Sequence, residues 1–306
     1  MEQTVELSVT VPVYNEEENV RALVAGLAAV LRPLERSFEL VVVDDGSSDE
    51  TVSVLRGLLE DIPELRVVEL SRNFGQTLAL QAALDIARGE IIVTMDGDLQ
   101  NDPADIPMLL ENLDGADVVS GWRRNRQDTL VLRKFPSWVA NRLIRAVTGV
   151  PIHDQGCSLK AYRGEFIRQL DLYGDMHRFI AILAMATGAR IVEVEVNHHP
   201  RTAGESKYGI SRTFKVLADL FTIQMLTWFR TQPIRFFALI GTPFLLASVL
   251  AGVLPWILTG WTPVWTSISL FLALTAGACI LVGMLGETLN EASAPQGRRS
   301  APFREC

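Results

Sequence analysis

The first hundred residues alternate short runs of β-branched and aliphatic residues with segments whose apolar residues recur at helical spacing. This order predicts a largely parallel sheet covered by helices on both faces, a Rossmann-like α/β fold of three layers. In such sheets, ligands bind at the carboxyl ends of the strands. The expected strands span residues 7–13, 38–43, 67–70 and 90–95, and the expected helices span residues 19–31, 49–59 and 77–87.

Two long runs near the end of the chain, 236–258 and 261–285, contain no charged residue. Each is long enough to cross a hydrocarbon core of about 30 Å as a helix. Trp256, Trp261 and Trp265 cluster where the first run ends and the second begins, as aromatic residues do at membrane interfaces. A pair of buried core helices is the alternative. We predict a two-helix transmembrane hairpin over residues 234–287, with spans at about 236–258 and 262–285.

The flanks of the hairpin carry arginine, whereas its connection, 259–263, carries no charge. Because Lys and Arg mark the cytoplasmic side, both termini and the domain over residues 1–210 are predicted to be cytoplasmic, in a multi-pass inner (plasma) membrane protein. The polar N-terminus predicts no signal peptide, and the tail, 288–306, is expected to be disordered. The small residues Gly277, Ala278 and Gly283 favour close association between helices, and they are compatible with a homo-oligomer.

The net charge is -8, from 28 Lys and Arg against 36 Asp and Glu, which argues against a nucleic-acid partner. Basic residues nevertheless cluster between residues 123 and 145. Cys157, Cys279 and Cys306 are isolated, with no CxxC spacing and no histidine at ligand spacing, so neither a disulfide framework nor a zinc site is expected.

Polar and acidic clusters follow three of the expected strands, at residues 12–19, 44–49 and 96–103. Because the carboxyl ends of parallel strands meet at one edge of a sheet, these clusters converge on one crevice. A D-x-D pair alone is more often a pair of solvated loop acids. Its position after a hydrophobic strand favours a site in which Asp96 and Asp98 hold Mg²⁺ or Mn²⁺ against the phosphates of a nucleotide.

The motifs PVYNEEENV, VDDGSSDET, RNFGQ and MDGDLQNDP resemble family-2 glycosyltransferases of the GT-A fold. GWRR at 121–124, HDQGCSLKAYR at 153–163 and RTAGESKY at 201–208 are similar to the polyprenyl-phosphate branch. That branch includes dolichol-phosphate mannose synthase and the bacterial undecaprenyl-phosphate glucosyl- and formamido-arabinose transferases. The resemblance covers about residues 5–285. It implies metal-dependent, inverting transfer of a monosaccharide from a UDP- or GDP-sugar to a polyprenyl phosphate, with undecaprenyl favoured, to give a lipid-linked sugar for the cell envelope.

The resemblance also implies roles for individual residues. Asp96, Asp98, Arg201 and Lys207 match catalytic residues, and the last two would stabilise the departing diphosphate. The full sets are nucleotide-sugar contacts at Pro12, Tyr14, Glu16, Val43, Asp45, Asp96, Asp98, Arg201 and Lys207, a metal shell at Asp96, Asp98 and Gln100, and an acceptor-phosphate pocket at Arg123, Arg133 and Ser137.

A phosphate acceptor changes what the chemistry requires. Its second pKa lies near 6, so it is largely dianionic at neutral pH and can attack the anomeric carbon without a general base. We therefore expect a single in-line displacement with no obligatory base, and Asp154 is the base candidate if one is needed.

Apolar residues recur at helical spacing between residues 214 and 228, which predicts a juxtamembrane helix over 211–233. It packs on the domain core or lies in the membrane interface as an amphipathic helix, as does a second, basic helix at 132–148. Two other functions stay open. A transferase acting on a lipid-linked saccharide or polymer would need a base near its acceptor, and the intact acidic and basic site residues argue against a non-catalytic nucleotide-sugar-binding scaffold.

Overall fold

The computed structural model of the 306-residue chain describes residues 5–124, 152–186, 188–200, 232–259 and 263–293. The chain divides into two compact units, Met1–Leu217 and Ala218–Cys306. The predicted juxtamembrane helix over 211–233 and the predicted basic helix at 132–148 lie outside the described residues, apart from the last two positions of the former.

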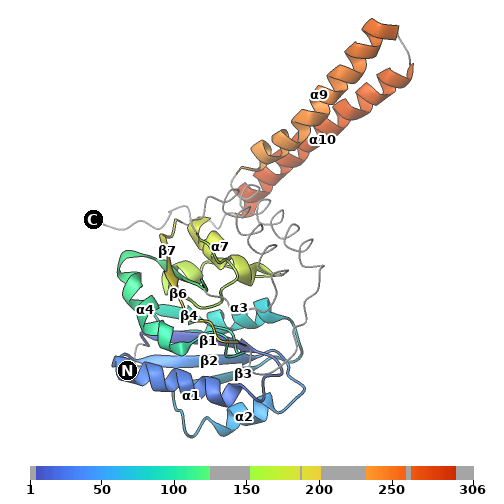
Figure 1. Cartoon of the computed structure of the whole chain (residues 1–306). Coiled ribbons are helices and arrows are strands. Elements are labelled where there is room, and N and C mark those ends of the chain that lie inside the picture. The colour runs from blue at the N-terminus through green and yellow to red at the C-terminus, as the bar shows by residue number, and fades with distance from the viewer. Residues whose placement is uncertain (1–4, 125–151, 187, 201–231, 260–262, 294–306) are drawn as a thin grey trace. The chain divides into compact units, whose positions relative to one another are not determined.

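The first unit is built on a seven-stranded sheet whose strands follow the order β3-β2-β1-β4-β6-β5-β7 (Figure 1). Neighbouring strands are parallel in the pairs β1–β2, β1–β4, β2–β3 and β5–β7, whereas β6 runs antiparallel to both β4 and β5. The strands are β1 (Leu7–Val13), β2 (Phe38–Asp44), β3 (Leu65–Glu69), β4 (Ile91–Thr94), β5 (Val118–Trp122), β6 (Lys160–Arg163) and β7 (Ile191–Glu195).

Helices cover both faces of this sheet, which makes the three layers that the sequence predicts (Figure 1). Alternate residues of β1 and β2, such as Val9 and Val42, pack with Leu23 and Leu27 on one face. Val41 and Val43 point to the other face and pack with α3. The helices are α1 (Val20–Leu31), α2 (Thr51–Gly57), α3 (Gln76–Ile86), α4 (Ile106–Glu111), α6 (Gly164–Ile167) and α7 (Ile180–Ala186), with 3₁₀ turns η1 (Arg32–Leu34), η2 (Pro103–Asp105), η3 (Asn112–Gly115) and η4 (Met176–Phe179).

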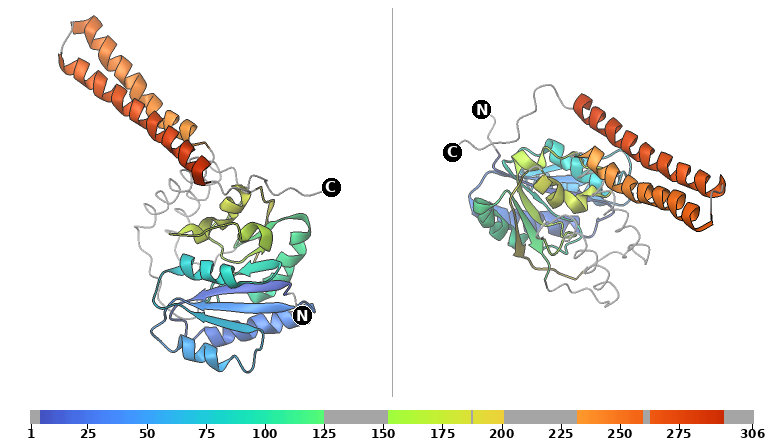
Figure 2. Two further views of the ribbon diagram at one scale, coloured as in Figure 1. Left: turned by 180° about the vertical axis from the view of Figure 1, so that it is seen from behind. Right: turned by 90° about the horizontal axis from the view of Figure 1, so that it is seen from above.

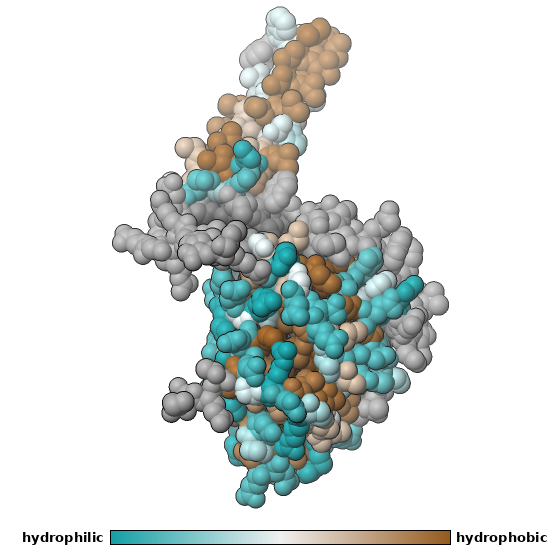
Figure 3. All heavy atoms as spheres, turned by 90° about the vertical axis from the view of Figure 1, so that its left-hand side faces the viewer, coloured by the Kyte–Doolittle hydropathy of each residue, from teal (hydrophilic) through white to brown (hydrophobic). Residues whose placement is uncertain are grey.

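The second unit contains a hairpin of two antiparallel helices, α9 (Pro233–Thr259) and α10 (Pro263–Ser293), which lie side by side in every view (Figure 2). Both are long and apolar enough to cross a membrane, and only 11% of each candidate span is buried within the structure. Such exposure favours a transmembrane hairpin over a pair of buried core helices, since core helices are covered. Brown, hydrophobic residues predominate on the hairpin, whereas the visible face of the first unit mixes teal and brown residues (Figure 3).

The second helix is longer than the sequence predicts. It continues to Ser293, so the prediction of disorder from residue 288 is wrong for residues 288–293. The reason is local, because helix-forming residues such as Glu287 and Leu289 continue the segment, and the helix breakers Pro295 and Gly297 come only afterwards. Residues 294–306 lie outside the described part of the chain.

The two helices of the hairpin approach closely at small residues. A Cβ placed on Gly283 would lie 3.0 Å from Cα of Ile234, whereas one on Gly277 would meet nothing within 4 Å. Between the helices, Ser248 and Ser269 each donate a hydroxyl hydrogen bond to the other's carbonyl, at 2.7 and 2.9 Å. Gly283, one of the residues expected to support association between chains, therefore packs within the hairpin itself.

Candidate active site

The loops after β1 and β2 are fastened together at the carboxyl edge of the sheet. The backbone N–H of Asn15 donates to Oγ of Ser47 and that of Ser48 donates to Oδ1 of Asn15, both at 2.8 Å. Asn15 has a φ of 55°, in the left-handed region that asparagine tolerates. The predicted nucleotide contacts Tyr14 and Glu16 are half-buried on either side of it. Pro12, also half-buried, is the next-to-last residue of β1.

Two of the predicted nucleotide contacts, Asp45 and Val43, have side chains that bind or pack against other residues of the protein. The buried carboxylate of Asp45 accepts the backbone N–H groups of Phe74, at 2.7 Å, and Gly75, at 2.9 Å. It therefore holds the loop that leads into α3. The side chain of Val43 lies in the core against Ala79 and Ala83, and Val43 pairs in register with Pro12 of β1 and Val68 of β3.

The turn after β4 carries the acidic pair. Oδ1 of Asp96 accepts a hydrogen bond from Nε2 of Gln76 at 2.7 Å, and Oδ1 of Asp98 accepts the backbone N–H of Gln100 at 3.2 Å. Gly97 lies against β1, because a Cβ there would come within 2.7 Å of the Val13 side chain. The turn is thereby held at the end of β1 as well as β4.

The electrostatics of the turn fit a bound cation. Burial raises the pKa of Asp96, and the adjacent negative charge of Asp98 raises it further, while Arg123 and Lys160 act in the opposite direction. Two half-buried carboxylates that repel each other are stabilised by a divalent cation, and carboxylate and amide oxygens are the ligands that Mg²⁺ and Mn²⁺ prefer. Within the described ranges no group of three or more His, Cys, Asp and Glu gathers as a metal site, so other ligands would come from the amide of Gln100 and from substrate phosphate.

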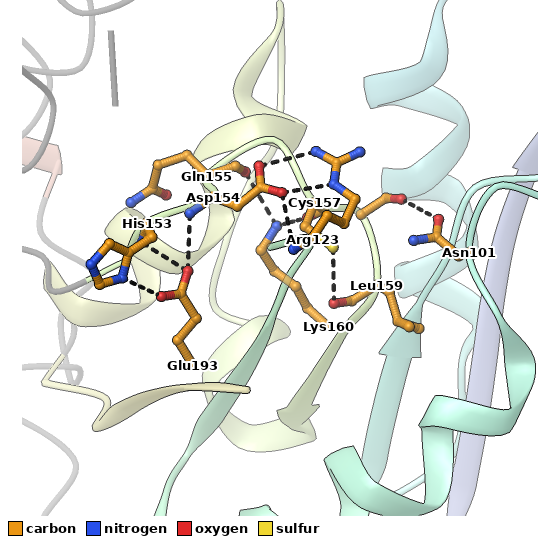
Figure 4. Close-up of polar contacts among 10 residues, drawn as sticks. Asn101, Arg123, His153, Asp154, Gln155, Cys157, Leu159, Lys160 and Glu193 are labelled. Atoms are coloured by element: carbon orange, nitrogen blue, oxygen red, sulfur yellow. Dashed lines mark hydrogen bonds and ion pairs between the residues drawn. The ribbon is translucent and has the colours of Figure 1, made fainter. Parts of the chain in front are cut away.

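A buried ion pair lies beside this turn (Figure 4). Nε of Arg123 donates to Oδ2 of Asp154 at 2.7 Å, and Nη2 donates to Oδ1 at 3.0 Å. The two side chains are only 10% and 8% exposed. Burial opposes the charge on the guanidinium, but Asp154 outweighs it and raises the pKa of Arg123 above its usual value. The sequence motifs gave these residues separate roles, whereas the structure joins them in one bidentate pair.

The loop that carries Asp154 is held by the edge strand β7. Oε1 of Glu193 accepts the backbone N–H groups of His153, at 2.7 Å, and Asp154, at 2.9 Å, and its Oε2 lies 2.7 Å from Nδ1 of His153 (Figure 4). The His153 ring stacks on Trp122 with the ring centroids 4.7 Å apart. Neighbouring strands thus fix the orientation of the Arg123–Asp154 pair.

Lys160 opens β6 and is 2% exposed, with its ammonium hydrogen-bonded to the carbonyls of Gln155, at 3.4 Å, and Cys157. Burial lowers the pKa of Lys160. Burial also raises the pKa of the Cys157 thiol to about 11, so this thiol stays protonated at neutral pH. The side-chain amide of Gln155 is buried and has no hydrogen-bond partner among the described residues.

The chain after β7 returns to the acidic turn. The backbone N–H of His199 donates to the carbonyl of Gln100 at 2.9 Å, and His198 forms an isolated antiparallel bridge with Asn101. Arg201 is the second residue after His199, and it lies outside the described residues, as do Lys207, Arg133 and Ser137. Their predicted roles stay predictions.

Sequence reasoning missed two parts of this site. Lys160 and Gln155 belong to a motif used for its resemblance, but nothing in the pattern indicates that both side chains are buried. Glu193 belongs to an edge strand, where an acidic residue is ordinary, and its pairing with His153 joins residues 40 positions apart. The alternation of polar and apolar residues carries no signal for such a contact.

Taken together, a mixed α/β sheet with an acidic pair in the turn at the carboxyl edge of its parallel strands is the arrangement of the GT-A fold. The solved structure of a mannosyltransferase from Pyrobaculum calidifontis, in complex with GDP-Man and Mn²⁺, is 21% identical, with a TM-score of 0.52 over 95% of this chain and 76% of that one. Glucosyl-3-phosphoglycerate synthase from Mycobacterium tuberculosis, with Mn²⁺, UDP and phosphoglyceric acid, is 20% identical with a TM-score of 0.57 over 72% of this chain and 78% of that one. At these identities the likeness establishes the fold.

The family is established by sequence. The profile described as "Glycosyl transferase family 2" matches residues 8–171, and the chain belongs to this family. Dodecaprenyl-phosphate galacturonate synthase of Rhizobium johnstonii is 49% identical over 78% of this chain and 72% of its own length. Undecaprenyl-phosphate 4-deoxy-4-formamido-L-arabinose transferase of Pseudomonas paraeruginosa is 37% identical over 93% and 85%. These relatives confirm the resemblance to the polyprenyl-phosphate branch.

Proposed function

We propose that this glycosyltransferase moves one sugar from a nucleotide-sugar donor to a polyprenyl phosphate, with inversion at the anomeric carbon. The observation that carries the proposal is that Asp96, in the turn with Asp98, lies within electrostatic reach of the buried guanidinium of Arg123. A metal-binding acidic pair beside a cation suits two anionic substrates, a nucleoside diphosphate and a lipid phosphate. The names of the relatives, with their polyprenyl-phosphate acceptors, supply the chemical class.

The reaction is a displacement at one carbon. A phosphate oxygen of the acceptor attacks the anomeric carbon, and the bond from that carbon to the donor diphosphate breaks, so that the nucleoside diphosphate leaves with the bonding electron pair. A divalent cation held by Asp96, Asp98 and Gln100 would neutralise negative charge on that leaving group. Arg201 and Lys207 are proposed to hold the same phosphates, because a planar guanidinium and a mobile ammonium both suit phosphate oxygens.

The geometry of Asp154 supports a reaction without a general base. Both of its carboxylate oxygens accept hydrogen bonds from Arg123, so this carboxylate is engaged by a guanidinium rather than placed to take a proton from an acceptor. We propose that the same guanidinium also meets the acceptor phosphate. Arg133 and Ser137 are proposed to complete this phosphate pocket.

The location follows from the hairpin. Two helices long and apolar enough to cross a membrane bring the chain to the bilayer, where a polyprenyl phosphate resides. Arginine residues on both flanks of the hairpin favour a cytosolic site and cytosolic termini in the inner membrane. A cytosolic site also has access to nucleotide sugars.

The test is a transfer assay with full-length protein in detergent or native membranes. Undecaprenyl phosphate is incubated with a panel of donors that includes UDP-galacturonate, UDP-4-deoxy-4-formamido-L-arabinose, UDP-glucose and GDP-mannose, with Mg²⁺, Mn²⁺ or EDTA. Mass spectrometry identifies the lipid product. We expect one donor to give a lipid-phosphate monosaccharide, and EDTA to abolish its formation.

A charge-matched pair of variants sharpens this test. Asp98→Asn removes a proposed metal ligand and should lower turnover by about 10²–10³-fold. Asp61→Asn removes one charge from an exposed position away from the strand ends and should leave turnover unchanged. Transfer that persists in EDTA, or a product in which the sugar is joined to a hydroxyl rather than to phosphate, would overturn the proposal.

A further inference from the structure

The segment Asn197–Pro200 is bound to the residues that follow the acidic turn by contacts along its length. In addition to the bonds of His198 and His199, Nε2 of His199 lies 3.0 Å from Oδ2 of Asp102. At the start of the segment, the backbone N–H of Asn197 donates to Oδ2 of Asp105 at 2.6 Å, and Nδ2 of Asn197 donates to Oδ1 at 2.8 Å. One carboxylate thus takes two parallel hydrogen bonds from one asparagine.

This bidentate contact lies in a protected environment. Asp105 is 6% exposed, and burial raises its pKa, whereas the two donors of Asn197 act in the opposite direction. A buried carboxylate without such donors would carry the full cost of its lost hydration. Asp105 is the last residue of η2, only a few positions beyond Gln100. The contact therefore holds the chain that follows β7 close to the turn of Asp96 and Asp98.

The position in the chain gives the contact a functional meaning. Arg201 comes two residues after His199 and four after Asn197, and consecutive Cα atoms are about 3.8 Å apart, so the contacts of His199 and Asn197 together limit the distance between Arg201 and the residues that follow the acidic turn. A residue that must meet a diphosphate oxygen loses much of its effect when its anchor shifts by about 1 Å.

We propose that Asp105 and Asn197 are positioning residues for the donor half of the reaction: they hold the chain that enters Arg201 against the acidic turn, and so set the affinity for the nucleotide diphosphate. The inference rests on the proposed function, in which Arg201 binds that diphosphate. It assigns neither residue a contact with substrate.

The test is an exchange of the two side chains. Asp105→Asn removes the buried negative charge, and the side-chain amide of Asn197 must turn over to present its oxygen to the new amide group. In Asn197→Asp, two carboxylates face each other. The double exchange restores one acidic and one amide partner in the reverse order. Each single variant should raise the donor KM, and the Kd for the nucleoside diphosphate with Mn²⁺, by about tenfold, which corresponds to about 1.4 kcal/mol. The acceptor KM should stay within about twofold, and the double exchange should recover most of the loss.

Several controls separate positioning from a general loss of structure. Asp114→Asn removes a charge from an exposed residue nearby in the sequence and should change neither KM. Thermal unfolding is followed for each variant, and if a single variant does not fold, recovery by the double exchange is scored in its place. Equal effects on donor and acceptor KM, or no recovery in a folded double exchange, would overturn the inference. Wild-type protein that binds nucleoside diphosphate but transfers no sugar to lipid phosphate refutes the proposed function alone, since nucleotide binding still reports on the anchor.

Discussion

Three aspartates near the strand ends show how neighbours decide what a carboxylate does. Asp45 is occupied by two backbone N–H groups, and Asp154 by the guanidinium of Arg123. Asp96 accepts one amide hydrogen bond from Gln76 and lies in the field of Asp98, so burial and repulsion both favour its protonated form. The same residue type therefore supports a loop at Asp45 and balances a buried cation at Asp154, and at Asp96 it is proposed to bind a metal ion.

The pairing of Asp154 leads to a prediction that separates stability from chemistry. Asp154→Asn leaves the buried guanidinium of Arg123 without its full counter-charge, which should lower the free energy of unfolding by about 3 kcal/mol. Turnover per folded molecule should stay within about tenfold, because the acceptor phosphate needs no base. Chemical denaturation and single-turnover transfer at low temperature measure the two quantities. A loss of turnover near 10⁴-fold in folded protein would instead identify Asp154 as a base.

At the scale of elements, Glu39 connects three strands. It lies in β2, accepts the Ser8 hydroxyl of β1 at 2.6 Å and pairs with Arg66 of β3 at 2.5 Å. The backbone N–H of Arg88 donates to the same carboxylate at 2.6 Å. Burial favours the neutral form of Glu39, but these donors outweigh it and lower its pKa.

The lowered pKa of Glu39 predicts the pH dependence of its contribution. Stability from a carboxylate with a depressed pKa is fully present above the ordinary glutamate pKa of about 4.3 and is lost as the pH falls through the folded-state value. Glu39→Gln should therefore cost about 2 kcal/mol at pH 7 and progressively less below about pH 4. Glu111→Gln, at an exposed position, should stay within about 0.5 kcal/mol of wild type. A difference that is equal at both pH values would contradict the assigned hydrogen bonds.

The sequence predicted strands β1 to β4 and the helices between them well, because the spacing of apolar residues in each segment indicates which of its faces is buried. Strand β1 has the expected bounds, Leu7–Val13, and the acidic motifs follow β1, β2 and β4 as expected. The insertion of β6, antiparallel, between β4 and β5 could not be predicted, because its four residues have no pattern of their own. Likewise Asn197 and Asp105 are 92 positions apart in the sequence, and hydrophobic periodicity does not predict contacts between residues so far apart.

At the scale of the whole molecule, the hairpin is longer than a bilayer requires. With 27 and 31 residues, α9 and α10 exceed the roughly 20 residues that span a hydrocarbon core of about 30 Å, so a membrane-spanning hairpin would tilt or extend into the headgroup region. Close packing at Gly283 holds the two helices together. Gly283→Leu should force them apart and lower stability in detergent by about 1–3 kcal/mol, whereas Gly277→Leu, which meets nothing within 4 Å, should not. Thermal unfolding in one detergent compares the two, and equal losses would contradict the packing.

The hydroxyl groups of this hairpin have a further consequence. Ser248 and Ser269 bond to each other's carbonyls, while Thr242, Ser267 and Thr275 each donate to the carbonyl four residues earlier. Each of these five hydroxyl groups donates its hydrogen to a carbonyl of the hairpin, so moving them from water into hydrocarbon would leave none of these donors without a partner. The serine and threonine side chains of the hairpin would therefore add little to the cost of inserting it into a bilayer.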